Sequence, residues 1–235
     1  MNAPLNYDVI SFDLDGTLVD TASEIAEAAN RALEQHAIPR RPPAEITQLI
    51  GAGTRELILK LLARAILDQP AFALSVRPDA LLASMDEHYA VIIGSSAIPY
   101  ADCHETLQRL KRAGLRLACV TNKELHHARR VLQITQLDGY FDLVIGGDSL
   151  PEKKPHPTVL QHVVSSLNVS RDRFAHLGDS AIDIQSARNA GVAAWAVPYG
   201  YNSGVPIVSA RPDRIFDGLL QVADLVLADR LPSAA

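Results

Sequence analysis

From about residue 95 onward, the chain alternates short apolar segments with amphipathic helical segments. Apolar segments occur at residues 115–120, 143–145, 174–177 and 193–197, and another at residues 7–12 starts the chain. Short apolar strands that alternate with helices are typical of a parallel sheet with helices on both faces. We therefore predict an α/β fold with a doubly wound parallel sheet.

The stretch that follows the first predicted strand has a different character. It is rich in Ala, Leu, Glu and Arg at helical spacing, and prolines divide it into several helices. Asp20 precedes the first of these helices and is predicted to cap its N-terminus. We therefore predict an α-helical domain of residues 21–92, inserted into an α/β core of residues 1–20 and 93–235.

Composition excludes several classes of protein. The chain has 235 residues, 48% of them hydrophobic, and a net charge of -5. No basic stripe favours nucleic acid, and no apolar run approaches the roughly 20 residues of a membrane span. Cys103 and Cys119 are expected to be reduced thiols, because they form no CxxC pair. Residues 1–4 lack the features of a signal peptide, so we expect a cytoplasmic protein.

Polar side chains follow four of the predicted strands, at the point where each strand ends. Ligands of open α/β sheets bind at the carboxyl ends of the strands, so we expect these side chains to form one site. They are Asp13, Asp15, Thr121, Asn122, Lys123, Lys154, Asp179 and Asp183.

These residue types suit phosphoryl transfer. That reaction needs a nucleophile in line with phosphorus, groups that neutralise the phosphate oxygens, and an acid for the leaving group. Carboxylates at Asp13 and Asp179 form a hard oxygen site suited to Mg²⁺. Thr121 can donate a hydroxyl hydrogen bond, and Lys154 can supply a positive charge. Gly16 allows a tight backbone turn beside the phosphate.

Four motifs resemble those of the haloacid dehalogenase-like (HAD) hydrolase superfamily. They are D-L-D-G-T-L at residues 13–18, V-T-N-K at 120–123, K-P-H-P at 154–157 and G-D-S-A-I-D at 178–183. The resemblance implies a HAD-like, Rossmannoid core with residues 21–92 as a mobile cap. Closure of such a cap would exclude water during phosphate transfer.

The resemblance also implies catalytic roles. Asp13 would be the nucleophile that forms an aspartyl-phosphate, and also a metal ligand. Asp15 would be the general acid/base and would bind the metal through its backbone carbonyl. Lys154 would orient Asp13 and offset the phosphate charge.

Four further motif residues would bind the phosphate or the metal. Thr121 and Asn122 would hold the phosphate, Asp179 would be a ligand of Mg²⁺, and Asp183 would support the metal shell. The implied cofactor is Mg²⁺, and the implied partner is a small-molecule phosphate ester. Neither nucleic acid nor a membrane is expected, and a homodimer is left open.

Other segments resemble bacterial phosphoglycolate phosphatases, which implies 2-phosphoglycolate as the substrate. They include L-I-G-A-G at residues 49–53, V-I-G-G-D at 144–148 and Y-G-Y-N at 199–202. Arg55 follows the first of these loops and is predicted to pair with the substrate carboxylate.

Three alternatives stay open at this point. The substrate could be another small phosphate, such as a sugar phosphate or pyrophosphate. The enzyme could be a mutase of the β-phosphoglucomutase kind, or the chain could be a catalytically dead binding module. Dehalogenation is disfavoured because the dehalogenases lack the aspartate present here as Asp15. Lys153 is predicted to lie at the surface, as are His126 and His127, whose spacing does not indicate a metal site.

Overall fold

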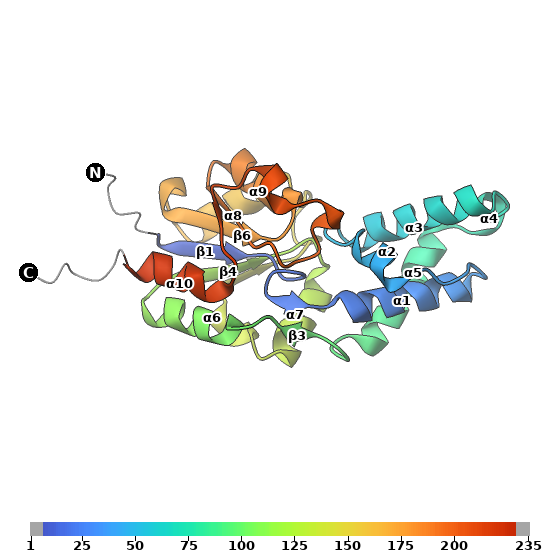
Figure 1. Cartoon of the computed structure of the whole chain (residues 1–235), viewed down its shortest axis with the longest axis horizontal. Coiled ribbons are helices and arrows are strands. Elements are labelled where there is room, and N and C mark those ends of the chain that lie inside the picture. Colours follow the sequence, from blue (N-terminus) through green and yellow to red (C-terminus); the bar gives the residue numbers. More distant parts are fainter. Residues whose placement is uncertain (1–6, 229–235) are drawn as a thin grey trace, which may run out of the picture.

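A six-stranded sheet forms the centre of the α/β core (Figure 1). The computed structural model describes residues 7–228, so both outer ends of the predicted core lie outside the described part. The strand order is β5-β4-β1-β6-β7-β8, and each neighbouring pair runs parallel. The strands are β1 (Val9–Phe12), β4 (Arg116–Val120), β5 (Leu143–Ile145), β6 (Phe174–Gly178), β7 (Ala193–Ala196) and β8 (Arg214–Ile215). The predicted α/β fold is confirmed.

Helices cover both faces of this sheet. They are α6 (Cys103–Arg112), α7 (Leu125–Ile134), α8 (Thr158–Ser166), α9 (Ala181–Ala190) and α10 (Leu219–Ala228). Successive strand side chains point to opposite faces, so Ile10 and Phe12 pack in the cluster with α6, α7 and α10. Val9 packs on the other face with α8 and α9. This two-sided burial explains why the strands are apolar throughout.

Five helices occupy the stretch between β1 and the rest of the sheet. They are α1 (Ala22–Gln35), α2 (Pro43–Thr47), α3 (Thr54–Asp68), α4 (Phe72–Ser75) and α5 (Pro78–Ile92). Their apolar faces form a hydrophobic cluster of their own. Figure 1 shows these helices beside the sheet, in blue to green. These helices are called the insert below. We retain the division into two domains as a proposal.

Two short strands connect the insert to the core. β2 (Val19–Asp20) pairs antiparallel with β3 (Ile98–Pro99), so the chain enters and leaves the insert through one narrow ribbon. Two-residue strands have no periodicity to detect, which is why neither was predicted. Asp20 was predicted as the cap of the helix that follows. The N-cap residue is Thr21, but Oδ1 of Asp20 accepts the backbone N–H of Ala22, the first residue of the helix, at 3.0 Å.

The sheet register brings the predicted site together. Phe12 of the central strand β1 lies opposite Cys119 on one side and Leu177 on the other. Asp13 and the residues just beyond β4 and β6 therefore emerge side by side, at the edge that faces the insert (Figure 1). Within residues 7–228, no helix combines the length and apolar character needed to cross a membrane.

Candidate active site

Three buried carboxylates meet at the carboxyl edge of the sheet. Oxygens of Asp13, Asp179 and Asp183 all lie within 4.8 Å of one another. Asp183 lies in the first turn of α9, where its Oδ2 accepts the Ser180 backbone N–H at 3.1 Å and the Ser180 hydroxyl at 2.6 Å. This capping box fixes the direction of the Asp183 side chain. Asp13 and Asp179 are fixed by the strands that they follow.

Lys154 places one ammonium group between two of these carboxylates. Its Nζ lies 2.8 Å from Oδ1 of Asp13 and 2.6 Å from Oδ1 of Asp183. Burial opposes the charge on Lys154, but the two carboxylates outweigh this and raise its pKa. Burial likewise disfavours the charge on Asp183, yet Lys154 holds the pKa of that carboxyl well below its usual range. Lys154 and Asp183 are therefore both charged.

Lys154 does not balance the charge that the other two carboxylates carry when both are ionised. Burial raises the pKa of Asp13 to about 6, even against the charge of Lys154. Burial and the charges of Asp183 and Asp13 raise the pKa of Asp179 to about 8. A divalent cation would relieve this repulsion, and a set of carboxylate oxygens suits Mg²⁺. The residues present therefore fit a divalent metal.

Glycine is required beside Asp179. Gly16 has φ +85°, and a Cβ there would lie 2.5 Å from Oδ2 of Asp179. A side chain at this position would both strain the backbone and collide with the carboxylate. Gly16 thus lets the loop after β1 pass directly against Asp179.

Asp15 has partners that differ from those of Asp13. Its two oxygens accept Nζ of Lys123 at 3.0 and 2.9 Å, and its Oδ1 accepts the hydroxyl of Thr21 at 2.6 Å. Lys123 also lies 4.7 Å above the ring of Tyr89 on α5. Lys123 was expected at this edge as part of the V-T-N-K motif, but no role was predicted for it. Its contacts with Asp15 and Tyr89 come from distant parts of the chain and are not visible in the motif.

Thr121 and Asn122 lie at the same edge, but their side chains already have partners. The Thr121 hydroxyl accepts the Lys123 backbone N–H at 3.2 Å. The Asn122 amide donates to the backbone carbonyls of Gly51 at 3.1 Å and Lys154 at 3.0 Å, and its buried Oδ1 has no hydrogen-bond partner. Asn122 therefore ties the insert to the Lys154 loop in this arrangement.

A cavity separates these polar residues from the insert. Its volume is about 30 Å³, room for roughly two water molecules. The core lines it with polar residues, and the insert lines it mostly with apolar ones. The lining residues are Asp13, Asp15, Thr121, Asn122 and Lys123 from the core, and Ile25, Ile50, Gly51, Gly53, Thr54, Leu57, Met85 and Tyr89 from the insert.

Arg55 does not line this cavity. Its side chain is 58% exposed, and Nη1 lies 3.5 Å from Oδ1 of the exposed Asp79. Consecutive side chains of a helix point about 100° apart. Thr54 lines the cavity, whereas Arg55, the next residue of α3, faces solvent. The structure therefore does not place Arg55 where it could pair with a substrate in the cavity.

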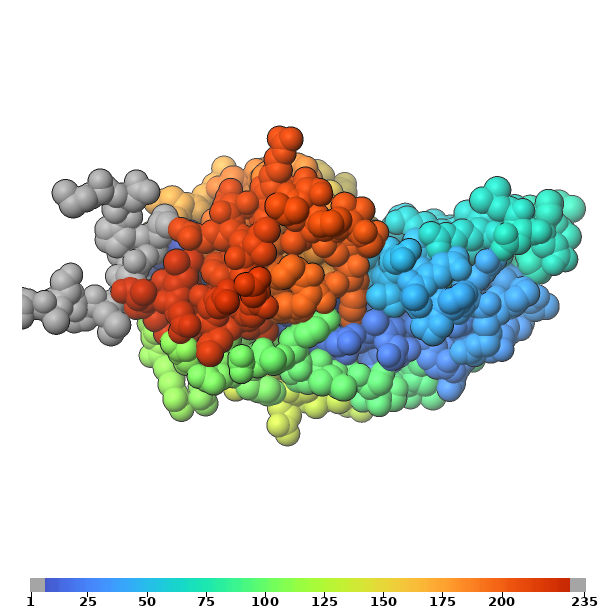
Figure 2. Space-filling view, viewed as in Figure 1, coloured from blue at the N-terminus to red at the C-terminus, as the bar shows by residue number. Residues whose placement is uncertain are grey.

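Several contacts close the insert over the core. Lys153 donates to the Ala52 carbonyl at 2.7 Å, and the Thr54 hydroxyl donates to Glu124 at 2.8 Å. His127 is buried against the insert, with Nε2 2.7 Å from Oδ1 of Asp86. The prediction that His127 lies at the surface was wrong, because its side chain is buried against the insert, whereas Lys153 is partly exposed and His126 is exposed. Figure 2 shows the insert and the core in contact on the face in view.

Comparisons with known proteins place the chain in a family. A family model described as haloacid dehalogenase-like hydrolase matches residues 10–197. The phosphoglycolate phosphatase of Vibrio vulnificus is 36% identical over 219 residues, which cover 93% of this chain and 96% of the relative. That of Nitrosococcus oceani is 32% identical over equal shares. The crystal structure of a predicted phosphoglycolate phosphatase from Haemophilus somnus superposes with a TM-score of 0.88 at 30% identity, covering 93% of this chain and 97% of that one. The chain belongs to the haloacid dehalogenase-like hydrolase family.

Proposed function

We propose that this phosphatase hydrolyses 2-phosphoglycolate, with Mg²⁺ as cofactor and an aspartyl-phosphate on Asp13 as intermediate. The observation that carries the proposal is the pairing of two carboxylates with two lysines at one strand end. Lys154 holds Asp13 at 2.8 Å, and Lys123 holds Asp15 at 2.9 Å, with both carboxylates on one small cavity. Relatives that match 93% of the chain are named phosphoglycolate phosphatases, which supports this substrate.

In the first step, a carboxylate oxygen of Asp13 attacks phosphorus and the bond to the glycolate oxygen breaks. Lys154 holds Oδ1 of Asp13 and limits the rotation of its carboxylate. Asp15 gives its proton to the leaving glycolate oxygen. Asp13, Asp179 and the backbone carbonyl of Asp15 would hold a bound Mg²⁺, and Asp183 would support these ligands. The ion would neutralise negative charge on the transferring phosphate.

In the second step, Asp15 accepts a proton from a water molecule that attacks the phosphorus of the aspartyl-phosphate. Phosphate leaves, and the Asp13 carboxylate is restored. Thr21 and Lys123 both orient Asp15 for this step. A base must be within hydrogen-bond reach of the proton that it removes, and these partners hold Asp15 at the cavity.

Lys123 connects recognition of the substrate carboxylate with proton transfer by Asp15. Within residues 7–228, it is the one residue of the cavity lining that carries a positive charge. The glycolate carboxylate would pair with Lys123, and Asp15 would then give up part of that pairing. Asp15 would thereby be free to carry the proton that the leaving group needs.

The insert side of the cavity is less suited to the alternative substrates. Ile50, Leu57 and Met85 present apolar surface there, and a sugar phosphate would need hydrogen-bond partners for its hydroxyls. A mutase would also have to hold a second phosphate, and one lysine offers little charge for it. With room for roughly two waters, the cavity is smaller than any of these esters, so we expect the insert to move before an ester enters.

The test is a comparison of catalytic efficiencies on phosphate esters with Mg²⁺ present. We expect kcat/KM to be highest for 2-phosphoglycolate, above a hexose phosphate and pyrophosphate, and Asp13→Asn to abolish turnover of all of them. A higher kcat/KM for a sugar phosphate would reject the substrate. Full activity of Asp13→Asn would reject the mechanism, and the absence of turnover with every ester would leave a binding module.

A further inference from the structure

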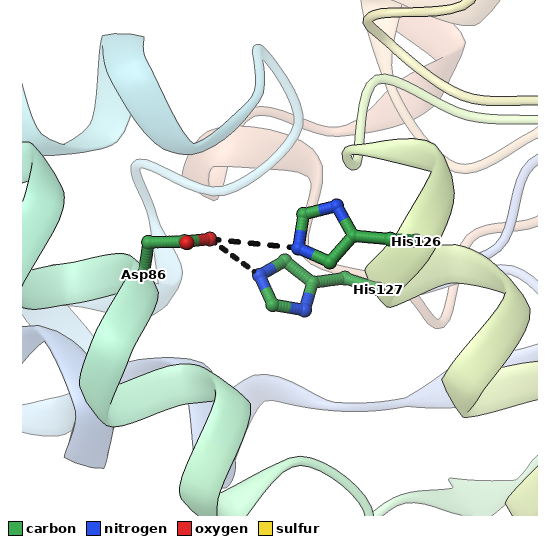
Figure 3. A group of neighbouring side chains, drawn as sticks. All are labelled: Asp86, His126 and His127. Atoms are coloured by element: carbon green, nitrogen blue, oxygen red, sulfur yellow. Dashed lines mark hydrogen bonds and ion pairs between the residues drawn. The ribbon is translucent and has the colours of Figure 1, made fainter.

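A second group of potential metal ligands lies where the insert meets the core (Figure 3). Asp86 belongs to α5 of the insert, whereas His126 and His127 are neighbours in the first turn of α7 in the core. One carboxylate oxygen and one nitrogen of each ring all lie within 4.8 Å of one another. None of these residues has a part in the phosphatase reaction proposed above.

Both imidazole rings converge on the same carboxylate oxygen, as Figure 3 shows. Nε2 of His127 lies 2.7 Å from Oδ1 of Asp86, and Nε2 of His126 lies 3.6 Å from it. Ligand atoms that are each about 2.1 Å from a tetrahedral ion lie about 3.4 Å apart. Adjustments on the order of 1 Å in the side chains would therefore place all three atoms around one ion.

A hydrogen bond accounts for the position of His127 but not for that of His126. A separation of 3.6 Å is beyond hydrogen-bond distance, and the His126 side chain is 60% exposed and could extend into water. Its ring instead packs against that of His127, with centroids 3.8 Å apart and the planes tilted by 42°, and presents its nitrogen to Asp86. Two imidazole nitrogens and one carboxylate oxygen form a ligand set that suits Zn²⁺, Co²⁺ and Ni²⁺, whereas Mg²⁺ prefers oxygen alone.

We propose that Asp86, His126 and His127 form a binding site for a divalent transition-metal ion that links the insert to the core. The side chains of Asp86 and His126 are 55% and 60% exposed, so an ion can enter from solvent and complete its coordination with water. His127 is a fixed ligand, because its side chain is 5% exposed and its ring packs edge-on against Tyr89, with centroids 4.9 Å apart.

A metal ion bound at this site restricts the movement of the insert. Tyr89 lies on the same helix as Asp86, one turn away, and lines the cavity under Lys123. An ion that joins α5 to α7 holds this part of the insert against the core, in the closed arrangement. The site is therefore a metal-dependent clasp beside the substrate cavity, distinct from the carboxylate cluster.

The experiment is a titration of the whole chain with Co²⁺, followed by visible absorption. Mg²⁺ is kept in large excess so that it fills the carboxylate cluster, which offers no nitrogen ligand. We expect one Co²⁺ per chain, and at least a tenfold loss of affinity in His126→Ala. The matched control is His88→Ala, which removes a half-buried histidine of α5 that bonds to Gln35 instead. It should bind Co²⁺ like the unaltered protein.

A second variant tests the link to the insert. Asp86→Asn keeps an oxygen that accepts the His127 hydrogen bond, so the fold is retained, but it removes the charged ligand. We expect it to lose Co²⁺ affinity as His126→Ala does. Unchanged binding in His126→Ala would overturn the site, and unchanged binding in Asp86→Asn alone would overturn the link. Because no turnover is measured, these outcomes do not depend on the proposed phosphatase substrate.

Discussion

Replacement of Asp179 by asparagine should stabilise the metal-free protein while removing its activity. The pKa of Asp179 is about 8, against an ordinary value of 3.8, because the ionised form is buried beside other carboxylates. At 1.36 kcal/mol per pH unit, this difference corresponds to a penalty on the order of 5 kcal/mol once Asp179 is ionised. Total stabilities are about 5–15 kcal/mol, so the penalty is a large fraction of the whole.

Asparagine removes the charge but also disturbs two hydrogen bonds. Oδ1 of Asp179 accepts the Thr17 hydroxyl at 3.2 Å, and Oδ2 accepts the Tyr201 backbone N–H at 2.7 Å. An asparagine has one oxygen, so one of these donors loses its acceptor, at a cost of about 1–3 kcal/mol. We therefore expect Asp179→Asn to raise the free energy of unfolding by about 2–4 kcal/mol at pH 8.

The sign of the pH dependence follows from the raised pKa. Between pH 4 and pH 8, the folded wild-type protein binds a proton at Asp179 that the unfolded chain has released, so its stability falls as pH rises. The asparagine variant has no titratable group at this position. Its advantage should be smallest near pH 4 and grow up to pH 8, as measured by urea unfolding of both proteins in a chelator.

Asp183→Asn is the control of opposite sign. Asp183 is held ionised by Lys154 at 2.6 Å, so its replacement leaves that buried ammonium with one partner fewer and should destabilise the protein. Addition of Mg²⁺ should stabilise the wild-type protein and have little effect on Asp179→Asn. If both variants destabilise equally, or if the effect of Asp179→Asn is independent of pH, the charge argument fails.

Three further variants test the cavity. Lys123→Met should lower kcat/KM for 2-phosphoglycolate by about 100-fold, because it removes two charge-assisted hydrogen bonds. The loss should be smaller for an ester without a carboxylate. Equal losses for both esters would contradict a role of Lys123 in binding the substrate carboxylate. Thr21→Val should lower kcat about tenfold, because Asp15 loses its 2.6 Å hydrogen bond, with Thr21→Ser retaining activity as the control. Arg55→Ala should leave KM within about twofold, since the side chain is 58% exposed and pairs with Asp79; a large rise in KM would mean that Arg55 reaches the substrate.

The parts of the site that follow strand ends were predictable from local sequence. Asp13 and Asp179 come directly after short strands that are buried on both faces, and such strands are visible as apolar runs. In a parallel sheet the carboxyl ends of all strands lie at one edge. The convergence of these residues therefore followed from the predicted topology.

Residues whose role depends on the orientation of the insert were not predictable in this way. Arg55 and Thr54 are adjacent in sequence, and only the way α3 packs against the core decides which of them faces the cavity. His127 looked like a surface residue because its partner, Asp86, is 41 residues away on another helix. Such contacts depend on how two helices pack, and the periodicity of either helix alone does not contain that information.

The Asp13–Asp15 pair shows why a motif alone does not assign catalytic roles. Both carboxylates come from one loop, two residues apart, yet their partners come from different parts of the chain. Asp13 meets Lys154 and two further carboxylates, an environment suited to a nucleophile held near a metal. Asp15 meets Lys123 and Thr21, which orient it toward the cavity but leave it outside the carboxylate cluster. Different surroundings for two neighbouring acids are what would separate the proposed nucleophile from the proposed proton carrier, and here they arise only when four strand ends and the ribbon to the insert come together.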